Sequence, residues 1–233
     1  MQMSPASLRS LERRAAVTSV LFAGHAAVTL LVALPPVARA VFLEDFVEPT
    51  AKQILSMMIG LSVLLAVLVG TIVSFLMWMH KAAKNLRELH PERAFTFSTG
   101  GVVGWWFVPF ANFVKPFQAM HEIWHASDPD LSRAKDADGY SAFVKLGSGA
   151  PQLLVGWWAA WIASNIIDRV VTRIDDVGLG VELFAGTINL VAAALAIVVV
   201  RTVTSMQRAS FEQRSQGHVA GELGHVVGTS PAE

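Results

Sequence analysis

The feature that most constrains this chain is a run of uncharged residues from Ile54 to Met79, 26 residues long. A helix rises about 1.5 Å per residue, so this run is longer than the roughly 20 residues needed to cross the ~30 Å hydrocarbon core of a bilayer. Only 15% of the chain is charged, against about 25% in an average soluble domain. The run therefore predicts a membrane-spanning helix and a membrane protein.

Three further apolar runs predict three more spanning helices. The first ends at Pro35-Pro36, and the last stops at Arg201. With the central run, the expected spans are residues 15–34, 54–79, 150–170 and 181–200. The fold class is thus an all-α membrane protein with four transmembrane helices, which together make a membrane domain over residues 15–200.

The first run also has a second interpretation, a cleaved signal peptide within residues 1–40. Arg13 and Arg14 precede the apolar residues, and Ala38-Arg39-Ala40 resembles a small-residue cleavage site. The uncharged run is, however, longer than the ~7–15 residues of a usual signal-peptide core. We therefore favour a spanning helix.

Basic residues indicate how the spans are oriented, because Lys and Arg gather on the cytoplasmic side of a membrane. They precede the first span and follow the second and fourth: Arg9, Arg13, Arg14, Lys81, Lys84, Arg87, Arg93, Arg201, Arg208 and Arg214. We expect a multi-pass protein of the cell membrane with a cytoplasmic N-terminus (residues 1–14). The tail, residues 201–233, would also be cytoplasmic and largely disordered at its end. Lys81, Lys84 and Arg87 could contact anionic lipid headgroups, at about 1 kcal/mol each.

The connection between the second and third spans contains a broken apolar segment. Gly100 to Val114 is too short for a comfortable span and is interrupted by Pro109. A stretch with helical spacing of apolar side chains follows it. We expect a re-entrant or interfacial hairpin over residues 100–126. Its binding or structural motif consists of Trp106, Pro109, Asn112, Pro116 and Trp124.

This segment is similar to a known family. It reads Trp-Phe-x-Pro-x-Ala-Asn-x-x-x-Pro over residues 106–116 and Glu-x-Trp-x-Ala-Ser over residues 122–127, and a tryptophan-rich span follows. In these motifs it resembles the bacterial membrane protein family of domain of unknown function 4328. The resemblance covers the second to fourth spans and implies an α-helical membrane domain with no assigned reaction.

One motif could carry metal chemistry. His121-Glu122-x-x-His125 matches H-E-x-x-H, which on a helix places two zinc ligands one turn apart with a glutamate as base. A catalytic zinc needs a third ligand, and Asp128 and Asp130 fall just past the expected helix. Short patterns of this kind arise often by chance. We therefore expect no catalytic residue, metal or cofactor, with a membrane zinc metalloprotease as one alternative.

Polar side chains inside the expected spans form a second class of candidate site, because each needs a partner in an apolar phase. They are His25, Asn165, Asp168, Arg169, Glu182 and Asn189. A polar seam among them would suit a small-solute transporter or channel component, for which a homo-oligomer would be needed to enclose a path. Several lie near one end of their spans, so we favour a network that holds helices together.

The favoured function is a non-enzymatic scaffold, sensor or partner-binding subunit that acts through the cytoplasmic hairpin. No complete catalytic set supports an enzyme. The 18 basic and 18 acidic residues cancel, so no net field attracts nucleic acid. The expected partners are the lipid bilayer and a protein that the sequence does not identify.

Overall fold

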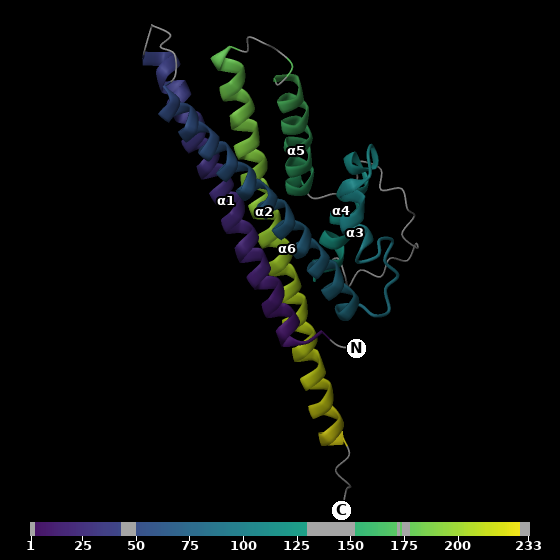
Figure 1. The fold of residues 1–233 in the computed structure, drawn as a ribbon. Helices are drawn as coiled ribbons and strands as arrows, with labels where there is room; N and C mark the ends of the chain where they lie inside the picture. Colours follow the sequence, from purple (N-terminus) through teal and green to yellow (C-terminus); the bar gives the residue numbers. More distant parts are fainter. Residues whose placement is uncertain (1–2, 43–49, 130–151, 172, 174–177, 229–233) are drawn as a thin grey trace, which may run out of the picture. The chain divides into compact units, whose positions relative to one another are not determined.

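The computed structural model describes residues 3–42, 50–129, 152–171, 173 and 178–228. These residues are helical with short connections, and none of them is in a strand (Figure 1). The helices are α1 (Pro5–Phe42), α2 (Ala51–Leu89), α3 (Gly101–Gly104), η1 (Trp105–Phe107), η2 (Ala111–Phe113), α4 (Lys115–Ser127), α5 (Gln152–Val171) and α6 (Leu179–Gly228). The all-α class predicted from the sequence is confirmed.

Three of the described helices are long and apolar enough to cross a membrane. The candidate segments are Pro5–Leu31 in α1, Ala51–Leu89 in α2 and Gly180–Gly217 in α6. Backbone polar groups cannot stay unpaired in lipid, and a helix satisfies them within its own segment. These helices therefore indicate a membrane protein.

The helix α5 coincides with most of the expected third span but is not among these three apolar helices. The expected first residues of that span, 150 and 151, lie outside the described residues. Within α5, Asn165, Asp168 and Arg169 replace apolar side chains over the last two turns. These polar residues interrupt the apolar run of α5 near its C-terminal end.

Two helices extend beyond the limits expected from the sequence. Helix α1 continues through Pro35-Pro36 to Phe42; membrane helices tolerate prolines that would end a helix in water. Helix α6 continues to Gly228, through a segment expected to lack fixed structure. No proline lies between Arg201 and Gly228, and the glycines there cost only about 1 kcal/mol each relative to alanine.

The chain divides into two compact units. The apolar unit comprises Arg13–Met79 and Val144–Arg201. The polar unit comprises Met1–Glu12, His80–Phe143 and Thr202–Glu233. Each unit has its own set of buried side chains and internal contacts.

In the apolar unit, aromatic and hydroxyl contacts join α1, α2 and α5. The ring of Phe75 on α2 lies 6.1 Å from that of Phe22 on α1 and 6.0 Å from that of Trp157 on α5. The hydroxyl groups of Thr18 and Ser74 are 2.7 Å apart and share a hydrogen bond. Packing of aromatic rings and small polar side chains is typical of helix association inside a membrane.

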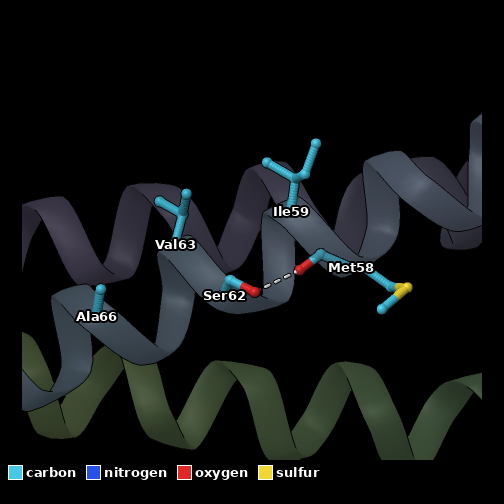
Figure 2. Close-up of a pocket in the computed structure, with 5 residues that line it drawn as sticks. All are labelled: Met58, Ile59, Ser62, Val63 and Ala66. Carbon is cyan, nitrogen blue, oxygen red and sulfur yellow. Dashed lines mark hydrogen bonds between the residues drawn. The ribbon is translucent and has the colours of Figure 1, made fainter.

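The outer face of α2 in the apolar unit is apolar and exposed. A shallow hollow on this face is lined by Met58, Ile59, Ser62, Val63 and Ala66 (Figure 2). The hydroxyl of Ser62 donates to the carbonyl oxygen of Met58 at 2.8 Å, so its polar atom is satisfied within the helix. None of the five side chains is titratable, and the hollow offers a surface for acyl chains rather than for chemistry.

The core of the polar unit includes buried side chains of α2, α4 and α6. Leu86 of α2, Met120 and Ile123 of α4, and Val203 of α6 are all at most 2% exposed. Hydrogen bonds from buried polar side chains link the same helices, as described below. This core holds α4, and with it the hairpin that contains the sequence motif.

Candidate functional site

The hairpin between α3 and α4 turns on a strained residue. The amide of Ala111 donates to the carbonyl oxygen of Pro109 at 2.7 Å, and Phe110 between them has φ 60° and ψ −40°. This three-residue turn belongs to the rare γ class, which is strained for a residue with a side chain. Such strain costs about 1–3 kcal/mol and persists only where surrounding contacts hold it.

Large apolar residues around this turn are exposed. Phe110 is 86% exposed and Phe107 is 69% exposed, while Val108 and Val114 are each 40% exposed. We call these four residues the hairpin tip. They are the only exposed large apolar residues of the polar unit among those that the structure describes. An apolar patch exposed in this way often marks an interaction surface.

The motif residues predicted from the sequence fall into two groups. Pro116 and Trp124 are buried in α4, with Trp124 only 6% exposed. Trp106 and Asn112 are half-buried, and within the described part of the chain the buried side-chain oxygen of Asn112 has no hydrogen-bond partner. Pro109 supplies the acceptor of the strained turn. The sequence analysis included Phe107 in the family motif but not among the binding residues, and it did not single out Phe110, although Pro109 signals a turn beside it.

Glu122 anchors the loop that precedes the hairpin. One carboxylate oxygen accepts the amide of Thr96 at 2.6 Å, and the other accepts the amide of Phe97 at 3.2 Å. The side chain is only 6% exposed. Both oxygens therefore accept hydrogen bonds from backbone amides. This is a structural role, and it leaves neither oxygen free to act as a general base.

Two basic side chains reinforce the same loop. Arg87 donates to the carbonyl oxygens of Ala83 and Phe97, and its guanidinium lies 4.9 Å from the centre of the Phe95 ring. The ammonium of Lys115 lies 5.9 Å from the centre of the Phe97 ring. Cation–π contacts of this kind contribute about 0.5–1 kcal/mol at exposed sites. The hairpin is thus held at its base from several directions.

The three residues predicted to contact anionic lipid differ in their surroundings. Arg87 contacts the loop, and Lys81 donates to the hydroxyl of Ser7 at 3.0 Å. Lys84 is the exposed member of the set. Lipid contact by these residues stays a prediction.

The two histidines of the H-E-x-x-H motif face each other on α4. Their Nε2 atoms are 3.0 Å apart, and their ring centres are 4.2 Å apart. His121 is 4% exposed, whereas His125 is half-buried. Within the described part of the chain, no third His, Cys, Asp or Glu completes a metal site with them. Asp130, one candidate for a third ligand, lies outside that part.

Side chains from α6 and from the end of α2 cap the C-terminal turn of α4. Ser210 donates to the carbonyl oxygen of Ser127 at 2.9 Å, and Gln207 donates to the hydroxyl of Ser127 at 3.1 Å. Gln207 also reaches the carbonyl oxygen of Ala82 on α2 at 3.2 Å. The last carbonyls of a helix have no partner within it, so such caps are needed where the helix end is buried.

His90 completes the cap and carries an identifiable tautomer. Its Nδ1 accepts from the guanidinium of Arg214 at 2.8 Å, so its Nε2 carries the proton and donates to the carbonyl oxygen of Ala126 at 3.0 Å. Burial, aided by the positive charge of Arg214, lowers the pKa of His90 below its ordinary value. His90 is a neutral structural residue that the sequence analysis missed, because its partners are far away in the sequence.

The intramembrane polar residues do not form one hydrogen-bonded seam within the described part of the chain. The amide of Asn189 on α6 donates to the carboxylate of Asp168 on α5 at 3.0 Å, and Asn165 bonds to Trp161 within α5. The Nδ1 of His25 is buried without a partner. Glu182 and Arg169 are exposed. The structure thus brings together Asp168 and Asn189 from this set.

The fold and these sites define a class, the α-helical membrane proteins with a structured segment between spanning helices. A family model described as Domain of unknown function (DUF4328) matches residues 42–208, and the chain belongs to this family. The matched region begins at the end of α1 and includes α2, the hairpin, α5 and most of α6. Neither the curated proteins nor the solved structures gave a match.

Proposed function

We propose that this chain is a non-enzymatic scaffold or partner-binding subunit of the cell membrane, and that the hairpin tip is its contact surface for another protein. The observation that carries the proposal is the placement of Phe107 and Phe110, which are 69% and 86% exposed; among the described residues of the polar unit, the other exposed large apolar residues are Val108 and Val114 of the same tip. Aromatic residues are enriched at the centres of protein interfaces.

The rigidity of the hairpin supports a recognition role. The carboxylate of Glu122 holds two backbone amides, and Pro109 and Pro116 restrict the chain on either side of the strained turn. A surface that is already ordered loses less conformational entropy when it binds. Strained backbone is common at functional sites, and the strained turn at Phe110 would present this side chain to a partner.

The topology belongs to the same proposal. The hairpin is interfacial and cytoplasmic, α5 is the third of four spans, and both termini are cytoplasmic. The division of the chain into units supports this arrangement, since the unit boundaries at Glu12–Arg13, Met79–His80 and Arg201–Thr202 lie close to the ends of the predicted spans. The basic residues near these boundaries would then all lie on the cytoplasmic side.

The contacts give less support to the two alternatives. Transport would need a continuous polar path, but the bond between Asp168 and Asn189 joins two neighbouring helices by itself, as expected of a helix–helix contact. Peptidase chemistry would need Glu122 as a base, but both oxygens of Glu122 hold the loop at Thr96 and Phe97.

The experiment compares co-purification from native membranes by the wild type, a Phe107→Ser/Phe110→Ser variant and a Lys84→Ser control. Lys84 is exposed in the same unit but outside the tip. We expect a protein that is recovered with the wild type and the control to be lost with the double variant, while all three chains insert equally. Equal recovery with the double variant would overturn the proposal.

A further inference from the structure

The pair of histidines on α4 is a candidate ligand set that the proposed function does not use. Its members come from adjacent turns, and their Nε2 atoms converge to 3.0 Å. Side chains at i and i+4 on a helix are neighbours, with Cβ atoms about 5–6 Å apart, so their end groups can meet. Here the two Nε2 atoms share a hydrogen bond, and the ring centres are 4.2 Å apart.

The separation of these nitrogens matches what a metal ion requires. Metal–imidazole bonds to zinc are about 2.0–2.1 Å long, so two nitrogens bound to one ion in tetrahedral or square geometry lie about 2.9–3.4 Å apart. The observed 3.0 Å falls within this range. We propose that His121 and His125 form a two-histidine chelate for a divalent transition metal such as Zn²⁺, Ni²⁺ or Cu²⁺, whose other positions are filled by water or by an outside ligand.

The surroundings of the pair already orient both rings, so an ion that binds them has to replace the proton shared by the two Nε2 atoms. His121 is 4% exposed, and the centre of its ring lies 6.3 Å from that of Phe117 one turn earlier, so its orientation is set by packing. His125 is half-buried, which gives an ion a route to the pair from solvent. A chelate whose ligands are already oriented loses little entropy when it takes up the ion.

The site differs from that of a zinc peptidase. In a peptidase the glutamate of the motif acts as base beside the metal-bound water. Glu122 instead holds the amides of Thr96 and Phe97 with its two oxygens. The chelate therefore binds metal on one side of α4 while Glu122 anchors the loop on another, and bound metal would clamp the helix that follows the hairpin tip.

The test uses the full-length chain without a histidine tag, purified in detergent and titrated calorimetrically with ZnCl₂ and with NiCl₂. We expect one equivalent of metal per chain and weaker binding as the pH is lowered through the histidine range, because only neutral imidazole is a ligand. Removing a group that only orients a ligand already costs about 10–100-fold in affinity. His125→Gln and His121→Gln should therefore each weaken binding by about tenfold or more.

Two controls make the result specific. His218→Ala removes a histidine from another helix, and Glu122→Gln removes the carboxylate of the motif; both should bind metal as the wild type does. Circular dichroism checks that each variant remains helical. If the more buried variant His121→Gln loses helicity, the metal affinity of His125→Gln by itself tests the proposal. Wild-type affinity in His125→Gln, loss of binding in His218→Ala, or less than one equivalent in the wild type would each overturn the proposal.

Discussion

The apolar unit exposes large apolar side chains on α1, α2, α5 and α6, whereas the polar unit, among the residues that the structure describes, exposes them only at the hairpin tip. In the apolar unit this exposure has one explanation, since hydrocarbon is the solvent of a spanning helix. Among the described residues of the polar unit, all large apolar residues outside the tip are buried or half-buried. The same kind of surface is therefore explained by lipid in the apolar unit, and the proposed protein partner concerns only the tip.

The two units also differ in how their polar groups are satisfied. In the apolar unit many side-chain donors bond to a carbonyl one turn earlier, as Ser62, Thr187 and Asn165 do. In the polar unit Glu122, Gln207 and His90 bond across long distances in sequence. The apolar unit is thus built from self-contained helices, while the polar unit depends on a few side chains that tie separate segments together.

The largest test of this contrast is Glu122→Ala. The change leaves the amides of Thr96 and Phe97 without their acceptor, and hydrogen bonds to charged groups contribute about 1.5–3 kcal/mol. We expect a loss of about 3 kcal/mol in the stability of the loop. Amide hydrogen exchange at residues 96 and 97 measures the loss directly. Unchanged protection at both amides would show that the carboxylate does not hold the loop.

A comparison of two buried amide side chains tests whether long-range hydrogen bonds stabilise the polar unit. Gln207 is fully buried and donates two hydrogen bonds, whereas Asn85 is fully buried and neither of its side-chain polar atoms has a partner among the residues that the structure describes. Gln207→Leu should destabilise the polar unit by about 1–3 kcal/mol, while Asn85→Leu should be nearly neutral or stabilising. Denaturant titrations of both variants make the comparison. Equal destabilisation would mean that Asn85 has a partner, such as buried water.

The stability of the polar unit should depend on pH through His90. Its pKa is lowered in the folded protein by burial and by Arg214, while Arg93 acts in the same direction and Glu92 opposes it. The unfolded chain therefore binds more protons, so the stability contributed by neutral His90 is present above about pH 6.5 and is lost as the pH falls toward the lower folded pKa. Unfolding followed from neutral to acidic pH should show this loss.

The control for the pH experiment is His90→Gln, which keeps an amide able to bond at the same place but does not titrate. The variant should be less stable than the wild type at neutral pH and should lose the part of the pH dependence that His90 supplies. An identical slope in the two proteins would assign the pH dependence to other groups.

A smaller effect of opposite sign is expected at the hairpin tip. Phe110→Gly relieves the strain at φ 60°, because glycine adopts positive φ without steric cost, and should stabilise the hairpin by about 1 kcal/mol. The same change removes the most exposed apolar side chain of the tip. Melting temperature and partner recovery should therefore move in opposite directions. A loss of both would mean that Phe110 packs within the polar unit.

The smallest expected effect lies in the apolar unit. Asn189→Ala removes the bond to Asp168, and interhelical hydrogen bonds in membranes average about 0.6 kcal/mol. Unfolding in detergent should show a change of about this size. A loss comparable to that from Glu122→Ala would contradict the view that the apolar unit is built from self-contained helices.

The parts of the fold that follow from local sequence were predictable. The apolar run from Ile54 to Met79 predicted a long apolar helix, which α2 confirms, and Pro109 marked a break in the short apolar segment; the re-entrant or interfacial hairpin stays a prediction. The role of Glu122 was not predictable, because its partners lie 25 and 26 residues away and nothing in the local pattern names them. The bond from Gln207 to Ala82 spans 125 residues and could be found only in the folded chain.

Within the hairpin motif, too, the sequence did not predict which residues are buried and which are exposed. Its tryptophans and prolines marked the segment, but the pattern did not separate Trp124, which is buried, from Phe110, which is 86% exposed. That difference depends on the strained turn, where a residue other than glycine takes a positive φ. The H-E-x-x-H motif likewise predicted that His121 and His125 lie one turn apart. It did not predict that Glu122 accepts hydrogen bonds from backbone amides.

The most direct measurement of the central claim is photo-crosslinking in native membranes. A photoreactive phenylalanine derivative placed at Phe110 is compared with the same group at Lys84, which is exposed in the polar unit but outside the tip. The account predicts a discrete protein adduct from position 110 and none from position 84. Adducts with lipid alone at position 110 would make the tip a membrane anchor and would contradict its role as a protein-binding surface.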